Sequence, residues 1–454
     1  MTHVVVVGGG ITGLVAAREA SLAGAEVTLV EPGRLGGKLQ TTPFDGGVLD
    51  EAADAFLARV PEGIALCEEL GLAGDLVAPS ERRAHVWSHG ELRRLPEAQL
   101  LGVPTDLDEL AASGIVSAEG LAAAHHDLEV PLIAPTGDIT IGSLIRARLG
   151  DDVAERLVDP LVGGINAGAT DALSLAATVP QLDAAARNGA PSLIAACQAQ
   201  RAAVVDPTAP VFFAPRGGMG VLPAALLRDL SARGIPVRAA AARSIERDGF
   251  RWRVHLDNGS IDADAVVIAT PAPVAAELVR GTAGRVAVLL AAIPYASVVM
   301  LSIAVARDAI ERDLDGSGFL VPRVEGLTIT ACSWASAKWP HLAGDGAVWL
   351  RASVGRAGAA PTGPLEARVL TDLEQTMALR GRPREVRISG WPESFPQYLP
   401  GHLERVDVID AELTRDMPGV VVAGAALRGL GVPACIRQGR AAARRVLTTL
   451  DAAS

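Results

Sequence analysis

The stretch that decides the fold is HVVVVGGGITG, residues 3–13. It begins with an apolar run, Val4–Val7, that has the length and β-branched character of a buried strand. Three glycines follow in the spacing Gly-x-Gly-x-x-Gly, at Gly8, Gly10 and Gly13. A glycine turn of this spacing between a strand and a helix is typical of a site for the pyrophosphate of a dinucleotide. The chain therefore begins with a predicted nucleotide-binding unit.

The residues after this turn complete the pattern. Residues 14–23 favour a helix that ends near Gly24, and Glu26–Val30 favours a second strand. The start of the helix offers free N–H groups and positive partial charge to a diphosphate. Glu31 ends the second strand, where a carboxylate accepts hydrogen bonds from a ribose diol. The motif alone leaves FAD and NAD both open.

The composition limits the class of protein. The chain has 454 residues, of which 49% are hydrophobic, so it is too apolar to be disordered and can bury a large core. Its formal net charge is −11, and aromatic residues make up only 3%. Because nucleic-acid binders need basic faces or stacking aromatic residues, no nucleic-acid partner is expected.

The cysteines and the N-terminus point to a compartment. The four cysteines, at positions 67, 197, 332 and 435, form no CxxC pair, so neither a disulfide framework nor a zinc site is expected. The first residues carry no signal-peptide pattern. We therefore expect a cytoplasmic protein with no bound metal.

One uncharged segment, residues 286–306, is about as long as a membrane span. Pro294 lies in its middle, and the residues after it are rich in β-branched side chains. We expect the end of a helix, a break at Ile293-Pro294 and then a buried strand, Ser297–Ala306. No transmembrane segment is expected, and a peripheral membrane contact stays open.

The rest of the chain alternates between helical and α/β patterns. Residues 105–205 favour helices, with apolar side chains every four residues over 145–161. Two later strands, 250–256 and Ile261–Thr270, are joined at Asp257-Asn258-Gly259, which is a strong hairpin signal. The tail favours a strand, Val420–Ala423, and a helix from about Val432 to Leu450.

Two further motifs resemble the amine-oxidase-like flavoprotein superfamily. Arg34-Leu35-Gly36-Gly37-Lys38 follows the ribose site, where that superfamily continues its FAD contact, and Gly431–Ile436 resembles its closing motif. Pro433 suits the first turn of a helix. The resemblance implies an α/β fold with a discontinuous Rossmann-like FAD-binding domain, a mixed-sheet substrate domain and an inserted helical domain. The implied segments are 1–80, 206–285 and 404–454 for FAD, 81–104 and 286–403 for substrate, and 105–205 for the helical domain.

Within that superfamily, the chain is most similar to the FAD-dependent porphyrinogen oxidases. The shared segments are Leu95-Pro96 with Leu101–Asp106, Arg148–Gly150 with Val158–Gly164, Gly218–Gly220, Lys338–His341, and Trp391 with Pro396–Tyr398 and Gly401-His402. The Lys338–His341 segment and residues 350–356 resemble the coproporphyrinogen-type members from actinobacteria.

The resemblance implies a set of site residues. For FAD these are Gly8, Gly9, Gly10, Ile11, Thr12, Gly13, Glu31, Pro32, Lys38, Ala52, Ala53, Asp54, Ala55, Ala242, Trp391, Val432, Pro433 and Ala434. For the substrate they are Arg83, Asn166 and Lys338. Arg82, Arg93 and Arg94 are further cations near the first of these. Arginine is preferred because its planar fork matches the propionates of a tetrapyrrole.

The implied reaction is the six-electron oxidation of coproporphyrinogen III to coproporphyrin III. FAD accepts two electrons at a time, no catalytic side chain is required, and dioxygen is the simplest final acceptor, giving hydrogen peroxide. The partners implied are the tetrapyrrole, dioxygen and a protein of haem biosynthesis.

Several departures keep alternatives open. Relatives often have Gly-Pro at Ala52-Ala53 and tyrosine at Asn166, which leaves room for a flavin-bearing porphyrin binder without activity. Protoporphyrinogen IX is the nearest alternative substrate. Amine oxidation or desaturation on the same fold is a further alternative, although Met300 stands where many amine oxidases carry a lysine.

Overall fold

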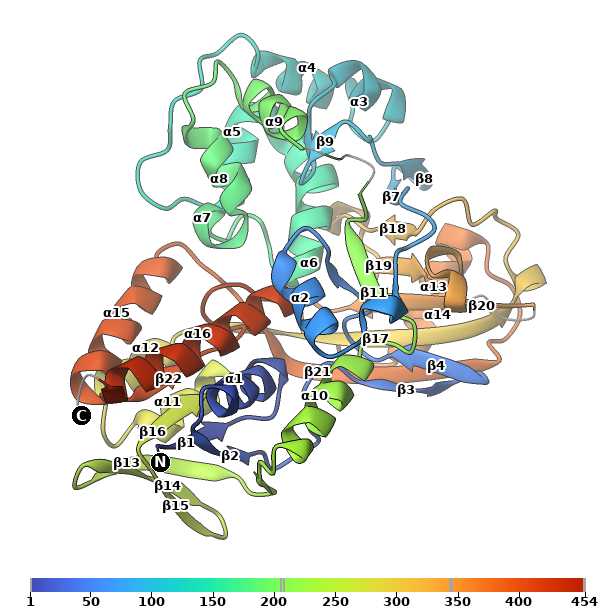
Figure 1. Ribbon diagram of the computed structural model, residues 1–454. Helices are drawn as coiled ribbons and strands as arrows, with labels where there is room; N and C mark the ends of the chain where they lie inside the picture. Colours follow the sequence, from blue (N-terminus) through green and yellow to red (C-terminus); the bar gives the residue numbers. More distant parts are fainter. Residues whose placement is uncertain (1, 205, 207–208, 343–345, 452–454) are drawn as a thin grey trace. The chain divides into compact units, whose positions relative to one another are not determined.

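Figure 1 shows the computed structural model of the chain, which describes residues 2–204, 206, 209–342 and 346–451. The residues group into two compact units. Unit 1 comprises residues 1–78, 210–294 and 403–454, and unit 2 comprises residues 79–209 and 295–402. The predicted division into an FAD-binding, a substrate and a helical domain stays a prediction.

Unit 1 is organised around a five-stranded parallel sheet. Its order is β12 (Val237–Arg238), β2 (Glu26–Val30), β1 (His3–Val7), β16 (Ala265–Ile268) and β22 (Val420–Val422). Val4, Val5 and Val6 are fully buried because both faces of such a sheet are covered. The predicted strand Glu26–Val30 is confirmed residue for residue.

Two helices pack on each other at this sheet, α1 (Ile11–Leu22) and α16 (Val432–Asp451). Leu14, Ala17 and Ile436 belong to one buried core with the strands. Helix α1 begins three residues earlier than residues 14–23 predict, because Gly10 serves as its N-cap.

The described residues of unit 1 contain fourteen further elements. They are β3 (Thr41–Phe44), β4 (Gly47–Asp50), β5 (Phe56–Leu57), α2 (Pro61–Glu69), η1 (Ala73–Asp75), β6 (Leu76–Val77), β11 (Phe212–Pro215), α10 (Val221–Ala232), β13 (Ala242–Asp248), β14 (Arg251–Leu256), β15 (Gly259–Ala263), α11 (Ala272–Val279), α12 (Gly284–Ala291) and α15 (His402–Asp416).

The single strand predicted over Ile261–Thr270 is wrong. The structure divides it at Asp264 into β15, which pairs with β14, and β16, which enters the parallel sheet. The backbone N–H of Asp264 donates to the carbonyl of His3, and its carboxylate accepts from the N–H of His3. These two bonds fix the change of sheet, and a run of apolar residues gives no sign of them.

Unit 2 contains a seven-stranded mixed sheet. Its order is β21 (Glu385–Pro396), β17 (Tyr295–Ala306), β20 (Ala347–Val354), β19 (Ile329–Trp334), β18 (Gly318–Leu320), β7 (His85–Ser88) and β8 (Glu91–Arg94). Only the pairing of β18 with β7 is parallel. The predicted break at Pro294 is confirmed, since α12 ends at Ala291 and β17 begins at Tyr295. None of the described helices is long and apolar enough to cross a bilayer.

Helices from residues 107–202 form a second core in unit 2. They are α3 (Leu107–Ser113), α4 (Ala118–His126), α5 (Ile141–Val153), η2 (Ala154–Gly163), α6 (Gly164–Asn166), α7 (Leu175–Thr178), α8 (Pro180–Arg187) and α9 (Leu193–Ala202). Segment η2 is a π-helix that contains Pro160. The remaining elements are β9 (Gln99–Leu100), β10 (Val103–Pro104), η3 (Arg307–Ala309), η4 (Arg323–Glu325), α13 (Ala335–Lys338), η5 (Pro340–Leu342) and α14 (Leu365–Met377).

Candidate cofactor and substrate site

The glycine turn between β1 and α1 is too crowded for any side chain at two positions. A Cβ on Gly13 would lie 1.9 Å from the carbonyl oxygen of Gly8. Gly8 has a φ of +110°, and a Cβ there would lie 2.7 Å from the carbonyl oxygen of Ala269. Glycine at both positions therefore lets β1, α1 and the end of β16 approach one another closely.

The middle glycine of the turn has the opposite environment. No described atom lies within 4 Å of the position that a Cβ on Gly10 would take. Gly10 caps α1 without any side-chain hydrogen bond, so the first-turn N–H groups, including those of Thr12 and Gly13, are not capped by a side chain at this end. This open, positively polarised helix end fits a diphosphate.

Glu31 is held in place by the backbone on both sides of it. One carboxylate oxygen accepts the N–H of Gly9 at 2.7 Å, and the other accepts the N–H of Gly33 at 2.8 Å. Each oxygen has further lone pairs, so the carboxylate can still accept a ribose hydroxyl. Pro32 follows directly in the chain, and Ala242 is the first residue of β13.

The second glycine turn lies against the first. The N–H of Gly36 donates to the carbonyl of Gly9 at 2.8 Å, and a Cβ on Gly37 would lie 3.2 Å from the Cα of Gly10. Burial lowers the pKa of the Lys38 amine, and the nearby Cys435 thiol opposes this shift. The segment that the sequence predicts to continue the cofactor contact is therefore next to the first glycine turn.

Two residues that sequence reasoning missed support the segment 52–55. Asp50 accepts the N–H of Met219 at 2.8 Å, and the Thr41 hydroxyl accepts the N–H of Gly220 at 2.8 Å. Both bonds anchor the hairpin β3–β4, which leads into Ala52, Ala53, Asp54 and Ala55. The partners are more than 160 residues apart in sequence. The glycine turn at residues 217–220 was the available signal in the sequence, because the free N–H groups of such a turn need acceptors elsewhere in the chain.

The end of the chain returns to the glycine turn. Helix α16 begins at Val432, with Pro433 and Ala434 in its first turn. A Cβ on Gly439 of this helix would lie 2.5 Å from the carbonyl oxygen of Thr12. Burial raises the pKa of the Cys435 thiol, and a hydrogen bond with Thr12 opposes that shift. The first and last predicted segments are therefore adjacent within unit 1.

Trp391 is the one predicted FAD residue that belongs to unit 2. It lies on β21 opposite Val298 of β17 and packs in a small apolar cluster. The other members of that cluster are Ala167, Ala296, Val298, Ala357 and Phe395. Met300 lies two residues further along β17, between Ser353 and Ser389 on the neighbouring strands.

The three predicted substrate residues occupy different surroundings in unit 2. Arg83 donates to both carboxylate oxygens of Glu81, at 2.9 and 2.5 Å. The Nζ of Lys338, at the end of α13, lies 5.0 Å from the centre of the Trp339 ring. The side-chain amide of Asn166 donates to the carbonyl of Val162, at 2.8 Å. These contacts do not link the three residues to one another, and their substrate roles stay predictions.

Comparison with known proteins gives a consistent result. Residues 11–447 match the family described as flavin containing amine oxidoreductase. The chain is 33% identical to coproporphyrinogen III oxidase of Bacillus subtilis (strain 168), covering 99% of this chain and 98% of the relative. It is 34% identical to coproporphyrinogen III oxidase of Propionibacterium freudenreichii subsp. freudenreichii, covering 100% and 92%. A solved structure from Exiguobacterium sp. 255-15, described as a protoporphyrinogen oxidase, matches with a TM-score of 0.88 and 31% identity over 99% of both chains.

Proposed function

Since the chain belongs to the family of flavin containing amine oxidoreductases, we propose that it is an FAD-dependent oxidase of coproporphyrinogen III. The observation that carries this proposal is the identity of 33–34%, over nearly the whole length, to two relatives named coproporphyrinogen III oxidase. The glycine turn, Glu31 and the open start of α1 supply the structural support, because they fit the diphosphate and ribose of FAD.

The bound FAD supplies the chemistry of two-electron oxidation. The residues of the chain bind and orient it. The N–H groups at Gly10 to Gly13 would hold the diphosphate, Glu31 would hold the ribose, and residues 34–38 and 52–55 would extend the contact. The partial positive charge at the start of α16 would stabilise negative charge on a ring bound there.

Coproporphyrinogen III loses six electrons and six protons when it becomes coproporphyrin III. Three two-electron oxidations of the substrate balance the reaction, and three molecules of dioxygen take up the electrons and protons as three molecules of hydrogen peroxide. The protein needs only to hold a bridging carbon close to the isoalloxazine, since aromatisation favours the product. We place this reaction in the cytoplasm, with a haem-biosynthesis protein as a partner that receives the porphyrin.

Anaerobic mixing of the FAD-loaded protein with coproporphyrinogen III tests the proposal. The flavin absorbance is expected to bleach while porphyrin fluorescence rises, and admission of oxygen is expected to restore the absorbance and release peroxide. Protoporphyrinogen IX, run in parallel, tests the alternative suggested by the Exiguobacterium neighbour. Bleaching by a polyamine instead would indicate amine oxidation, and a flavin that neither porphyrinogen reduces would indicate a binder without activity.

A further inference from the structure

Unit 2 contains a cavity whose described walls carry only positive charge. Its volume is about 290 Å³, and three arginines, Arg323, Arg356 and Arg368, lie in its lining. The other described lining residues are glycine, alanine, leucine, valine, proline and threonine, so no carboxylate neutralises the cavity from within. A concave site lined by three arginines in an acidic protein of net charge −11 is suited to an anion.

Two of the three arginines already have partners. Arg368 donates to the Thr328 hydroxyl at 3.1 Å and to the carbonyl of Thr362 at 3.3 Å. Arg323 donates to Asp159 at 3.0 Å and also to the carbonyl of Gly168. These bonds hold the two side chains in fixed positions at the cavity wall.

Arg356 differs from both. Among the described residues, its guanidinium makes no hydrogen bond and no ion pair within 4 Å, although the side chain is half-buried. Burial lowers its pKa and the charge of Arg323 lowers it further, while Asp159 opposes the shift. Asp159 is already engaged, since its oxygens accept from Arg323 and from both the N–H and the hydroxyl of Thr170. The donors of Arg356 are therefore available to an incoming acceptor.

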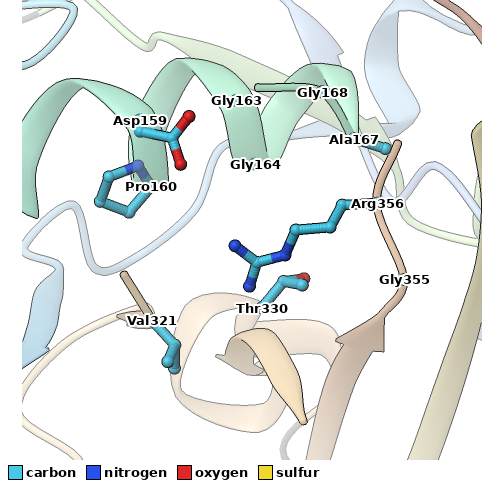
Figure 2. A pocket seen from close by; sticks show the side chains of 10 residues that line it. All are labelled: Asp159, Pro160, Gly163, Gly164, Ala167, Gly168, Val321, Thr330, Gly355 and Arg356. Carbon is cyan, nitrogen blue, oxygen red and sulfur yellow. The ribbon is translucent and has the colours of Figure 1, made fainter. Parts of the chain in front are cut away.

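The backbone fixes the direction of this arginine. Gly355, just after β20, has a φ of +98°, and a Cβ there would lie 2.6 Å from the carbonyl oxygen of Ser297. Only glycine permits the turn that follows. Figure 2 shows the Arg356 side chain extending from this turn into the space between η2, which carries Asp159, and Thr330. Gly355 and Arg356 line this small space and the larger cavity alike.

The position of the turn connects the cavity with Trp391. The N–H of Ala357 donates to the carbonyl of Ala167 at 2.7 Å, and both alanines pack in the cluster that contains Trp391. Ala167 also lines the small space beside Arg356. An anion held by Arg356 would thus lie one residue along the chain from the cluster that carries the predicted FAD residue of this unit.

We propose that Arg356, framed by Arg323 and Arg368, binds a carboxylate, and that this carboxylate is a propionate of the tetrapyrrole. The identity of the anion rests on the proposed function, whereas the cavity itself does not. A carboxylate matches the guanidinium fork with two parallel hydrogen bonds, and it neutralises a cation that forms no ion pair with any described carboxylate. Arg356 is a substrate-binding residue in this account, and Arg323 and Arg368 are positioning residues.

Binding of the oxidised product tests this site without turnover. FAD-loaded wild type, Arg356→Gln, Arg356→Lys and the control Arg382→Gln are titrated with coproporphyrin III, with quenching of tryptophan fluorescence as the readout. Arg382 is an exposed arginine outside the cavity, so its variant makes the same charge change elsewhere. Arg356→Gln is expected to weaken binding about tenfold or more, and Arg356→Lys less, because lysine keeps the charge and loses the fork.

The tetramethyl ester of coproporphyrin III removes the carboxylates, so wild type and Arg356→Gln are expected to bind it equally. The melting temperature of each variant is measured to detect misfolding. Arg356→Gln removes a half-buried cation next to another cation, so its melting temperature is expected to be unchanged or raised. A lowered melting temperature together with equal loss of acid and ester binding would show a structural role and overturn the inference.

The outcomes separate this inference from the proposed function. If wild type oxidises coproporphyrinogen and Arg356→Gln binds and turns over like Arg382→Gln, the inference fails alone. If wild type binds the acid through Arg356 without oxidising the porphyrinogen, the proposed function fails alone. If wild type does not bind coproporphyrin III at all, the propionate assignment fails.

Discussion

The glycine turn of unit 1 and the arginine cavity of unit 2 are built on opposite principles. The turn is made by backbone atoms within six consecutive residues, and its shape follows from what a Cβ would collide with. The cavity is lined by η4, the turn after β20 and α14, which lie between residues 323 and 368. The glycine turn can therefore be predicted from the spacing of neighbouring residues. The arginine cavity depends on which separate segments the fold brings together.

Substitution of the turn glycines is expected to have the largest effect. Gly13→Val would place a side chain 1.9 Å or less from the carbonyl oxygen of Gly8, so we expect colourless protein with less than about a tenth of the wild-type flavin. Gly10→Ala has room for its methyl group, and it is expected to fold but to bind FAD weakly. Flavin absorbance per protein and circular dichroism distinguish the two results.

The matched control is Gly284→Ala, at the start of α12, where a Cβ also meets no described atom. It is expected to retain its flavin and its melting temperature. Full flavin content in Gly13→Val would break the claim that backbone approach builds this site.

Substitutions of charged residues near the arginine cavity are expected to have a smaller effect, because they change electrostatic interactions and not the backbone. Asp159→Asn removes the carboxylate that accepts from Arg323 and whose charge also acts on Arg356, so the free energy of unfolding is expected to fall by about 3 kcal/mol. Adding Arg356→Gln removes one of the two stranded cations and is expected to restore part of that loss. Denaturant titration of the two single variants and the double variant measures the coupling. If the changes in the free energy of unfolding were strictly additive, Arg356 and Asp159 would not interact.

A smaller effect is expected from the carboxylate at the ribose position. Glu31→Gln keeps the shape of the side chain and one acceptor oxygen. It removes the negative charge and one of the two oxygens that accept the N–H groups of Gly9 and Gly33. We expect the dissociation constant of FAD to rise by about tenfold, because charge-assisted hydrogen bonds are replaced by neutral ones. Titration of the apoprotein with FAD measures it. An unchanged constant would show that Glu31 serves the turn and not the ligand.

The smallest expected effect belongs to an exposed ion pair. Hydrogen bonding from Arg83 lowers the pKa of Glu81 to about 2. A lowered pKa in the folded state contributes stability at pH values above the ordinary value of 4.5, and that contribution is lost as the pH falls towards about 2. Since exposed pairs contribute little, Glu81→Gln is expected to lower the melting temperature by no more than about two degrees at pH 7, and by nothing near pH 2. A difference that grows as the pH falls would contradict this assignment.

These differences explain how far the sequence could be interpreted. The turn at Gly8 to Gly13, the strand Glu26–Val30 and the break at Pro294 follow from local rules, and the structure contains all three. The division at Asp264 could not be predicted, because it depends on hydrogen bonds with His3, which lies 261 residues earlier in the chain. The support of the 52–55 segment by Thr41 and Asp50 depends on equally distant partners.

Arginine 356 illustrates the same limit for the site. The sequence predicted that arginines recognise the propionates, with Arg83 as the candidate. In the structure, Arg83 donates to the carboxylate of Glu81, two residues away. The local sequence offers one difference, since Glu81 stands two residues before Arg83 and no carboxylate stands within two residues of Arg356. Packing shows that Arg83 forms an ion pair with Glu81, whereas Arg356 forms no ion pair with any described residue even though the charge of Asp159 acts on it.

The parallel sheet of unit 1 also sets the timing of folding during synthesis. Its strand β22 pairs with β16, yet about 150 residues separate the two in the chain. At ordinary rates of translation, β16 leaves the ribosome on the order of ten seconds or more before its neighbour. During that interval the nascent polypeptide exposes an unpaired parallel edge, a surface prone to aggregation that chaperones shield. A chain stalled or truncated before residue 420 would be expected to stay at that stage, associated with a chaperone and without flavin.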